Sequence, residues 1–247
     1  MSGPHFDDDR DYFAAIAQTY DRLQPVIAGP SYQAGLDFVL RLIPHEAGEK
    51  FVCVELGCGT AALTAGALAR FPAAECVAID NETAMLEIAR RKLAAYGGRA
   101  DLREADAGTV RIPECDLVLS SFMLHHVPPE DLPVLLRRVA TGLSPGGCAI
   151  FLDTMQAGPR WGEQMGTLSG RLYRAHVRAA IASGQTTQDE IDARWAFKRK
   201  MRDEGKDVEY RHSAEHLLDA MQEASLDEVG LVWRMFASTI LVGFVPA

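Results

Sequence analysis

Short apolar runs alternate with segments of helical periodicity between residues 51 and 153. Helical spacing is clear over 60–70 and 82–95, and Pro128 and Pro129 open a further helix. The apolar runs between these helices have the length of buried strands, namely 51–56 (FVCVEL), 75–80 (ECVAID), 101–105, 116–121 (DLVLSS) and 148–153 (CAIFLD). Fully apolar strands that alternate with helices are typical of a parallel sheet covered on both faces. The sequence therefore predicts an α/β, doubly wound fold.

The segments on either side of this core break the alternation. Residues 1–45 predict two helices, around 12–23 and 32–42, that Pro25 and Pro30 separate. Residues 154–205 are mainly helical and poor in strands. Two helical additions to one sheet are suited to covering a site at the strand ends.

The last part of the chain completes the sheet. The turn sequence SPGG at 144–147 precedes the fifth strand, and Ser213 is the expected N-cap of a helix. Two β-rich runs, 229–235 and 238–245, lie so close together that a tight turn must join them as an antiparallel pair. We therefore expect four parts: a helical N-terminal cap (1–45), the core (46–153), a helical lid insertion (154–209) and a completion of the core (210–247).

Composition excludes several classes of protein. Of the 247 residues, 48% are hydrophobic and 24% charged, which is the balance of an ordinary globule, and no apolar run approaches the length of a membrane span. The net charge of −9 argues against nucleic acid and anionic membranes as partners. A basic stretch at 194–202 is followed at once by acids, so we interpret it as a solvated helix face. The acidic N-terminal residues differ from a secretory signal, and we expect a cytoplasmic protein.

A glycine loop follows the first predicted strand. Gly57 and Gly59 separate that strand from a helix, where glycine permits positive φ and close approach to a ligand. The run also fits the dinucleotide pattern G-x-G-x-x-A, but Glu55 next to the loop would repel a pyrophosphate and suits a cationic ligand. Asp80 ends the second strand, where a carboxylate binds ribose hydroxyls, and Asp106 follows the third, where one accepts a hydrogen bond from an adenine amine.

These features resemble the class I S-adenosylmethionine (SAM)-dependent methyltransferases. The similar segments are VELGCGTAALT (54–64), VAIDNETAMLEIAR (77–90), ADA (105–107), CDLVLSSFMLHHV (115–127) and LSPGGCAIFLD (143–153), in the order of the family. The resemblance implies a Rossmann-like, mostly parallel sheet of about seven strands that ends in the antiparallel pair. It also implies SAM as cofactor. The family often has glycine where Ala61 stands, and we expect little effect of this difference on binding.

The resemblance also assigns roles to individual residues. It implies that the loop and the strand ends bind SAM through Glu55, Gly57, Cys58, Gly59, Asp80, Asn81, Met85, Asp106, Ala107, Ser120 and Ser121. Several of these residues have a structural alternative. Asp80 is also a possible N-cap, Asp106 an ordinary loop acid, Met85 a core residue, and Cys58 a filler of the loop.

Methyl transfer needs alignment of the acceptor and, for some acceptors, a base. His125 or His126 is our first choice for this base, because imidazole titrates near neutrality, although a histidine pair is often structural. His176, Tyr20 and Tyr12 are further candidates. We expect no metal site, since Asp153 is the only acid near the fourth and fifth strands and the five cysteines show no C-x-x-C spacing.

The acceptor is expected to be a small molecule. The run SSFM at 120–123 replaces the Asn/Asp-Pro-Pro-Tyr motif of enzymes that methylate amino groups of nucleic acid bases or glutamine. Aromatic side chains in the two helical additions either line an acceptor pocket or anchor the lid, namely Phe13, Tyr20, Tyr32, Trp161, Tyr173, Trp195 and Phe197. A homodimer is expected from general statistics alone.

Three other functions stay open at this point. The N-terminal segment and the insertion are loosely similar to carboxy-SAM synthases, which is our alternative to methyl transfer to N or O of a metabolite or natural-product intermediate. A nucleotide-binding dehydrogenase fits the glycine pattern but not Glu55. A SAM-binding protein without catalytic activity has the same cofactor residues.

Overall fold

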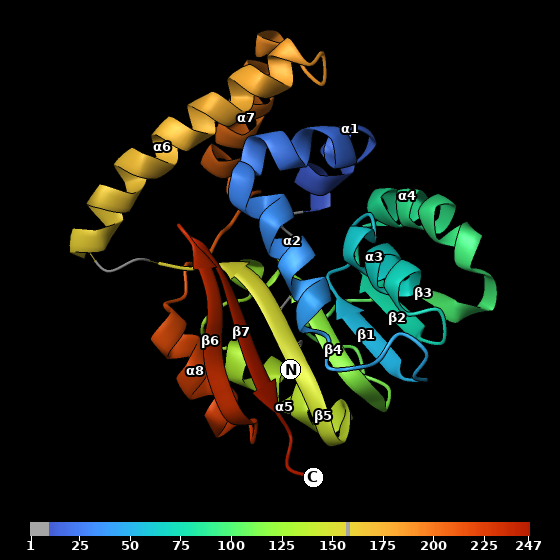
Figure 1. The fold of residues 1–247 in the computed structure, drawn as a ribbon. Helices are drawn as coiled ribbons and strands as arrows, with labels where there is room; N and C mark the ends of the chain where they lie inside the picture. Colours follow the sequence, from blue (N-terminus) through green and yellow to red (C-terminus); the bar gives the residue numbers. More distant parts are fainter. Residues whose placement is uncertain (1–9, 157–158) are drawn as a thin grey trace.

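The computed structural model describes residues 10–156 and 159–247, and seven strands form one sheet within these ranges. The strand order is β3-β2-β1-β4-β5-β7-β6 (Figure 1). All pairs from β3 to β5 are parallel, and β7 is antiparallel to β5 and β6. The strands are β1 (Val52–Leu56), β2 (Glu75–Asp80), β3 (Ala100–Glu104), β4 (Cys115–Ser121), β5 (Leu143–Thr154), β6 (Asp227–Met235) and β7 (Ser238–Phe244). This confirms the predicted α/β fold.

Helices cover both faces of the sheet, because successive strand residues point to opposite sides. Cys53 and Leu117 belong to a core with α2 (Pro30–Leu42), α3 (Ala62–Arg70) and α4 (Thr83–Leu93). Val54 and Val118, their chain neighbours, belong to a second core with α5 (Leu132–Gly142) and α8 (Ala214–Glu223). Burial on both faces explains why these strands are apolar along their whole length.

The remaining long helices lie beyond the end of the sheet where β1, β2 and β4 finish. They are α1 (Arg10–Ala28), α6 (Pro159–Ala182) and α7 (Gln188–Asp203), and in Figure 1 α1 runs between the α6–α7 pair and α4. Apolar side chains join α1 to both neighbours, since Leu23 and Ile27 cluster with Val177 of α6, and Ile16 clusters with Met85 of α4. The division into cap, core, lid and completion remains a prediction.

Two local expectations were wrong. Pro25 does not separate two helices but lies inside α1, and only Pro30, after Gly29 at φ 84°, marks a helix boundary. The SPGG segment does not precede the fifth strand but belongs to β5, where the register shifts between the pairs Cys115–Leu143 and Leu117–Cys148. The predicted cap Ser213 does accept a hydrogen bond from the backbone N–H of His216 at the start of α8.

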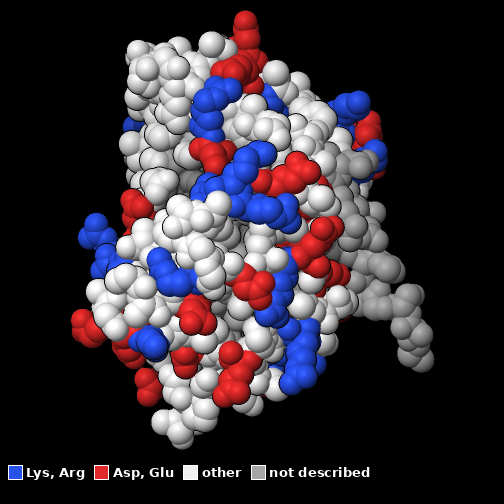
Figure 2. Space-filling view, turned by 90° about the vertical axis from the view of Figure 1, so that its right-hand side faces the viewer, with Lys and Arg blue, Asp and Glu red and all other residues white. Residues whose placement is uncertain are grey.

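The surface over α3, α4 and β3 carries mixed charge. Figure 2 shows basic and acidic side chains next to one another on this face, without a continuous basic strip. Among the described helices, none combines the length and apolarity needed to cross a lipid bilayer.

Candidate active site

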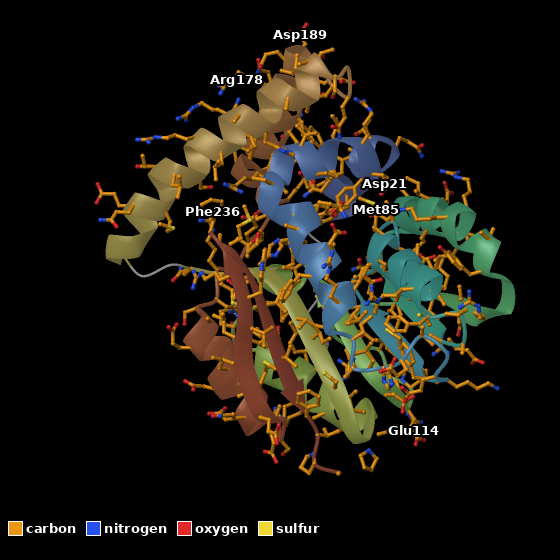
Figure 3. All side chains as sticks on the ribbon, viewed as in Figure 1. Asp21, Met85, Glu114, Arg178, Asp189 and Phe236 are labelled. Carbon is orange, nitrogen blue, oxygen red and sulfur yellow. The ribbon has the colours of Figure 1, made fainter. Side chains whose placement is uncertain are left out.

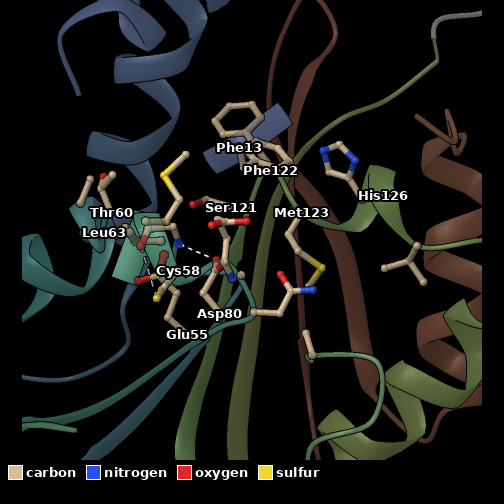
Figure 4. A pocket seen from close by; sticks show the side chains of 18 of the residues that line it. Phe13, Glu55, Cys58, Thr60, Leu63, Asp80, Ser121, Phe122, Met123 and His126 are labelled. Atoms are coloured by element: carbon tan, nitrogen blue, oxygen red, sulfur yellow. Dashed lines mark hydrogen bonds between the residues drawn. The ribbon is translucent and has the colours of Figure 1, made fainter. Parts of the chain in front are cut away.

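A cavity opens where β1, β2 and β4 end, below α1 (Figure 4). Most of the residues predicted for the site line it, namely Tyr20, Glu55, Gly57, Cys58, Gly59, Asp80, Asn81, Met85, Asp106, Ala107, Ser121 and His126. Several further lining residues carry no signal in the sequence that marks them for the site, namely Thr60, Leu63, Glu82, Val208 and Tyr210. Val208 and Tyr210 come from a segment far along the chain, so no local signal marks them.

The glycine loop gives the cavity a floor of bare backbone. Gly57 and Gly59 have φ values of 68° and 52°. A Cβ atom on Gly57 would lie 2.4 Å from Cγ of Met123, whereas one on Gly59 would meet no atom within 4 Å. Gly57 therefore allows Met123 to pack directly on the loop, and at Gly59 the loop leaves room for a ligand to approach its main chain.

Asp80 holds this loop in place. Its Oδ2 accepts a hydrogen bond from the backbone N–H of Gly59 at 2.7 Å, and its Oδ1 accepts one from the N–H of Glu82 at 2.9 Å. Burial raises the pKa of Asp80 above its ordinary value, although these bonds favour the carboxylate. Asp80 thus links the glycine loop to the start of α4, and the carboxylate also lines the cavity.

Ala61 adopts a left-handed conformation, with φ 57°. This is unfavourable for a residue with a Cβ atom, by about 1–2 kcal/mol. A glycine at this position would avoid that cost, while the small alanine side chain still fits among buried neighbours of the first core.

Glu55 lies beneath the loop rather than in open solvent. Its side chain is 1% exposed, and Oε2 accepts hydrogen bonds from the backbone N–H and the hydroxyl of Thr64 in α3. Burial outweighs these bonds and raises the pKa of Glu55 to about 8. Since Glu55 is also part of the cavity lining, a cation bound there would favour its charged form.

We expect Glu55→Gln to remove a pH dependence of stability. The folded protein holds a proton on Glu55 up to about pH 8, while the unfolded chain releases it near pH 4.5. The contribution of Glu55 to the free energy of unfolding is therefore fully present below pH 4.5 and is lost as the pH rises to about 8. The variant keeps an acceptor for Thr64. Its melting temperature should therefore decline less than that of the wild type from pH 5 to pH 8.5, and parallel curves would contradict this assignment.

The end of β3 contributes a second turn of backbone and one carboxylate. Asp106 accepts a hydrogen bond at Oδ1 from the N–H of Gly108 at 2.7 Å, and Asp106, Ala107 and Gly108 all line the cavity. Met85 faces the same space from α4 and is at the same time a buried member of the cluster with Ile16. The two proposed roles of Met85, core packing and ligand contact, are thus compatible.

Only one serine at the end of β4 lines the cavity. Ser121 does, whereas Ser120 is 1% exposed and donates its hydroxyl to the carbonyl oxygen of Leu56 in the neighbouring strand. Phe122 follows with φ 53°, a strained conformation, and its ring stacks on Tyr32 at 4.9 Å. This bend turns Phe122 and Met123 into the cavity (Figure 4).

The two neighbouring histidines have different environments. His126 lines the cavity, and its Nδ1 lies 3.0 Å from the carbonyl oxygen of Val208. A carbonyl can only accept, so Nδ1 carries the proton and Nε2 is the basic nitrogen of the neutral ring. The ring of Phe13 packs edge-to-face with this imidazole, with the ring centroids 5.5 Å apart.

His125 is outside the lining and pairs with Asp153 instead. Nδ1 of His125 lies 2.6 Å from Oδ1 of Asp153, whose other oxygen accepts from the backbone N–H of His125 at 3.2 Å. Burial alone would lower the pKa of His125, but Asp153 outweighs it and raises the pKa above the ordinary value. The pair fixes the loop after β4, and the His125 and His126 rings are 4.2 Å apart.

The other candidate bases are poorly suited to that role. Burial and a hydrogen bond with Tyr32 raise the pKa of Tyr20 well above its ordinary value, so Tyr20 faces the cavity as a hydroxyl donor. Tyr12 is buried outside the lining and stacks on Phe197 at 5.8 Å. His176 lies with Nε2 3.1 Å from the carbonyl oxygen of Pro25.

The aromatic residues of the helical additions divide between the two expected roles. Phe13, Tyr20 and Tyr32 line the cavity. Tyr173 and Trp195 instead join α6 to α7 through a hydrogen bond of 2.9 Å from the indole to the phenol. The side chain of Trp161 lies outside the described residues. Over the described residues, no group of three or more His, Cys, Asp or Glu side chains is arranged to hold a metal ion.

Comparison with known proteins agrees with this geometry. Residues 53–147 match the family model described as a methyltransferase domain. The carboxy-S-adenosyl-L-methionine synthase of Trichlorobacter lovleyi is 35% identical over 106 residues, 41% of this chain and 43% of the relative. That of Campylobacter lari is 26% identical over 143 residues, 58% of this chain and 61% of the relative. The chain thus spans about half the length of these relatives.

Solved structures show the same fold. The complex of DhpI with SAH matches with a TM-score of 0.65 at 16% identity, over 100% of this chain and 99% of that chain. Human N-acetylserotonin methyltransferase in complex with SAM matches with a TM-score of 0.61 at 16% identity, over 99% of this chain and 61% of that chain. Residues 53–147 therefore match a methyltransferase domain, and the fold is the one found in this human methyltransferase with bound SAM, which agrees with the predicted resemblance to the class I SAM-dependent methyltransferases.

Proposed function

We propose that this chain is an enzyme that transfers the methyl group of SAM to a nitrogen or oxygen atom of a small-molecule acceptor. The observation that carries the proposal is a single cavity in which the bare glycine loop and the strand-end carboxylates meet an aromatic wall. When bound, SAM supplies the electrophilic methyl group on its sulfonium. The chain itself has to bind, align and desolvate the two reactants.

The cofactor half of the cavity fits an adenosyl sulfonium. In this proposal Asp80 and Asn81 hold the ribose, Asp106 and Ala107 the adenine edge, and the glycine loop the methionine part. The lining fits because the main chain at Gly59 is open, with no atom within 4 Å of the place a Cβ would take, and because its charged residues are acids, which suit a cation. None of the described lining residues is Lys or Arg.

The opposite half fits an apolar, ring-shaped acceptor. Its surface comes from Phe13, Tyr32, Phe122, Met123 and Tyr210, with the hydroxyl of Tyr20 as a donor. In this proposal Nε2 of His126 takes up the proton that the methyl acceptor releases. The carbonyl oxygen of Val208 holds the imidazole in the tautomer that has its proton on Nδ1. His125 acts as a positioning residue, because its pair with Asp153 fixes the loop after β4 that carries His126.

One observation favours the alternative, a carboxy-SAM synthase. Arg194 in α7 is 6% exposed, and its Nε and Nη2 form no hydrogen bond within the described part of the chain. The guanidinium lies 5.8 Å from the ring of Tyr12 and acts electrostatically on Tyr20 in the cavity wall. Two buried cationic N–H groups without a hydrogen-bond acceptor are costly, and a ligand carboxylate is the kind of group that would pair with them.

Three measurements test the proposal. Calorimetry should detect binding of S-adenosylhomocysteine but not of NAD, and mass spectrometry of the ligand that copurifies should find SAM or its product rather than carboxy-SAM.

Incubation with SAM and a panel of aromatic amines and phenols should release S-adenosylhomocysteine, and His126→Asn should lower the rate of this release without weakening cofactor binding. Bound NAD, or bound carboxy-SAM, would overturn methyl transfer as the function.

A further inference from the structure

Three consecutive residues of α1 contact three different parts of the molecule. Successive side chains on a helix point about 100° apart. Tyr20 therefore faces the cavity, Asp21 faces the glycine loop and α4, and Arg22 faces the turn between α6 and α7. Figure 3 shows Asp21 next to Met85, on the side of α1 nearest α4.

Asp21 binds the glycine loop directly. Its Oδ1 accepts a hydrogen bond from the hydroxyl of Thr60 at 2.5 Å, and its Oδ2 pairs with Nζ of Lys92 in α4 at 2.8 Å. Nζ of Lys92 also donates to the Thr60 hydroxyl at 3.2 Å. Thr60 is 2% exposed, so its hydroxyl depends on these partners, whereas the half-exposed Asp21–Lys92 pair alone contributes little.

Arg22 makes the corresponding contact with the α6–α7 turn. Its guanidinium forms two hydrogen bonds with the carboxylate of Glu190, at 2.9 and 2.7 Å, and a third with the carbonyl oxygen of Gln185 at 3.0 Å. The side chain of Gln185 donates back to the carbonyl oxygen of Arg22 at 3.2 Å. Glu190 also closes the capping box of α7 with Thr187, so this contact fixes the start of that helix.

We infer that Asp21 is a positioning residue of the cofactor site, and that Asp21 and Arg22 together couple occupation of this site to the order of the α6–α7 turn. The inference rests on the proposed function, because it takes the glycine loop as the place where the cofactor binds. Apolar packing joins α1 to α6 and α7 on one side and to α4 on the other, so the helix connects the two contacts. A ligand that orders Thr60 also orders Asp21 and, one residue on, Arg22.

Calorimetric titration with S-adenosylhomocysteine tests the first half of this inference. Asp21→Ala should weaken binding about 10-fold, since it removes the acceptor of a buried hydroxyl. Asp21→Asn keeps that acceptor and should lose less, which guards against a general folding defect. Asp189→Ala, at the far tip of the α6–α7 hairpin in Figure 3, is the control and should bind like the wild type.

Hydrogen exchange with and without S-adenosylhomocysteine tests the coupling. In the wild type the ligand should slow exchange in residues 183–192, and in Arg22→Gln this protection should disappear while affinity stays within about twofold, because an exposed ion pair contributes little to binding elsewhere. Wild-type affinity in both Asp21 variants, or protection that persists in Arg22→Gln, would overturn the inference and leave the proposed function intact. A wild-type protein that does not bind the ligand would overturn both.

Discussion

Gly57→Ala is expected to lower the affinity for S-adenosylhomocysteine by at least about 100-fold, a loss of roughly 2.7 kcal/mol. Gly57 has φ 68°, and the added methyl group would lie 2.4 Å from Cγ of Met123. The clash involves Cβ and Cγ of Met123, close to its backbone, so either the glycine loop or the segment after β4 has to shift, and both line the cavity. Isothermal titration calorimetry measures the change directly.

Gly184→Ala is the matched control for this substitution. Gly184 has φ 74° in the α6–α7 turn, and a Cβ atom there meets nothing within 4 Å. Both variants should lose about 1–2 kcal/mol of unfolding free energy through backbone strain. Only Gly57→Ala should lose the ligand, so equal affinities for the two variants would mean that no ligand lies over the glycine loop.

The parallel strands could be predicted closely because each is buried on both faces. The predicted bounds of β2, 75–80, agree with the structure, and those of β1 and β4 differ by one residue. Burial on both sides requires an apolar run, and such a run is visible in the sequence without any knowledge of its neighbours.

Helix α1 shows where local signals fail. Pro25 lacks an N–H group and ordinarily ends or kinks a helix, yet α1 continues to Ala28. Leu23, Val26 and Ile27, which surround Pro25 in the chain, are buried against α6 and α7, and this packing offsets the lost backbone bond. The partners lie about 150 residues away, as the contact between Pro25 and His176 shows, so the sequence around Pro25 does not reveal them.

The candidate site divides in the same way. The glycine loop, Asp80 and Asp106 follow directly from strand ends, and the structure brings them together. The choice between Ser120 and Ser121 depends on which strand face meets the cavity, and the choice between His125 and His126 depends on Asp153 in β5 and Val208 after α7. These partners are 28 and 82 residues from the histidines, beyond the reach of a local pattern.

Asp80→Ala is expected to weaken binding of S-adenosylhomocysteine by about 10- to 100-fold, equivalent to one to three kcal/mol for charge-assisted hydrogen bonds. Two mechanisms lead to this loss. Either the carboxylate binds the ribose of the ligand, or it acts only by holding the N–H groups of Gly59 and Glu82 and so shapes the loop. Calorimetry with the single ligand does not separate them.

Adenosine separates these mechanisms, because it keeps the ribose and lacks the methionine part that we place over the glycine loop. If Asp80 binds the ribose, Asp80→Ala should lower the affinities for adenosine and for S-adenosylhomocysteine by similar factors. If Asp80 acts through the loop alone, adenosine should be little affected. Asp80→Asn keeps one acceptor oxygen and should lie between the wild type and the alanine variant. Unchanged affinity for both ligands would show that the end of β2 does not bind the nucleoside, and the cofactor would then have to be placed elsewhere in the cavity.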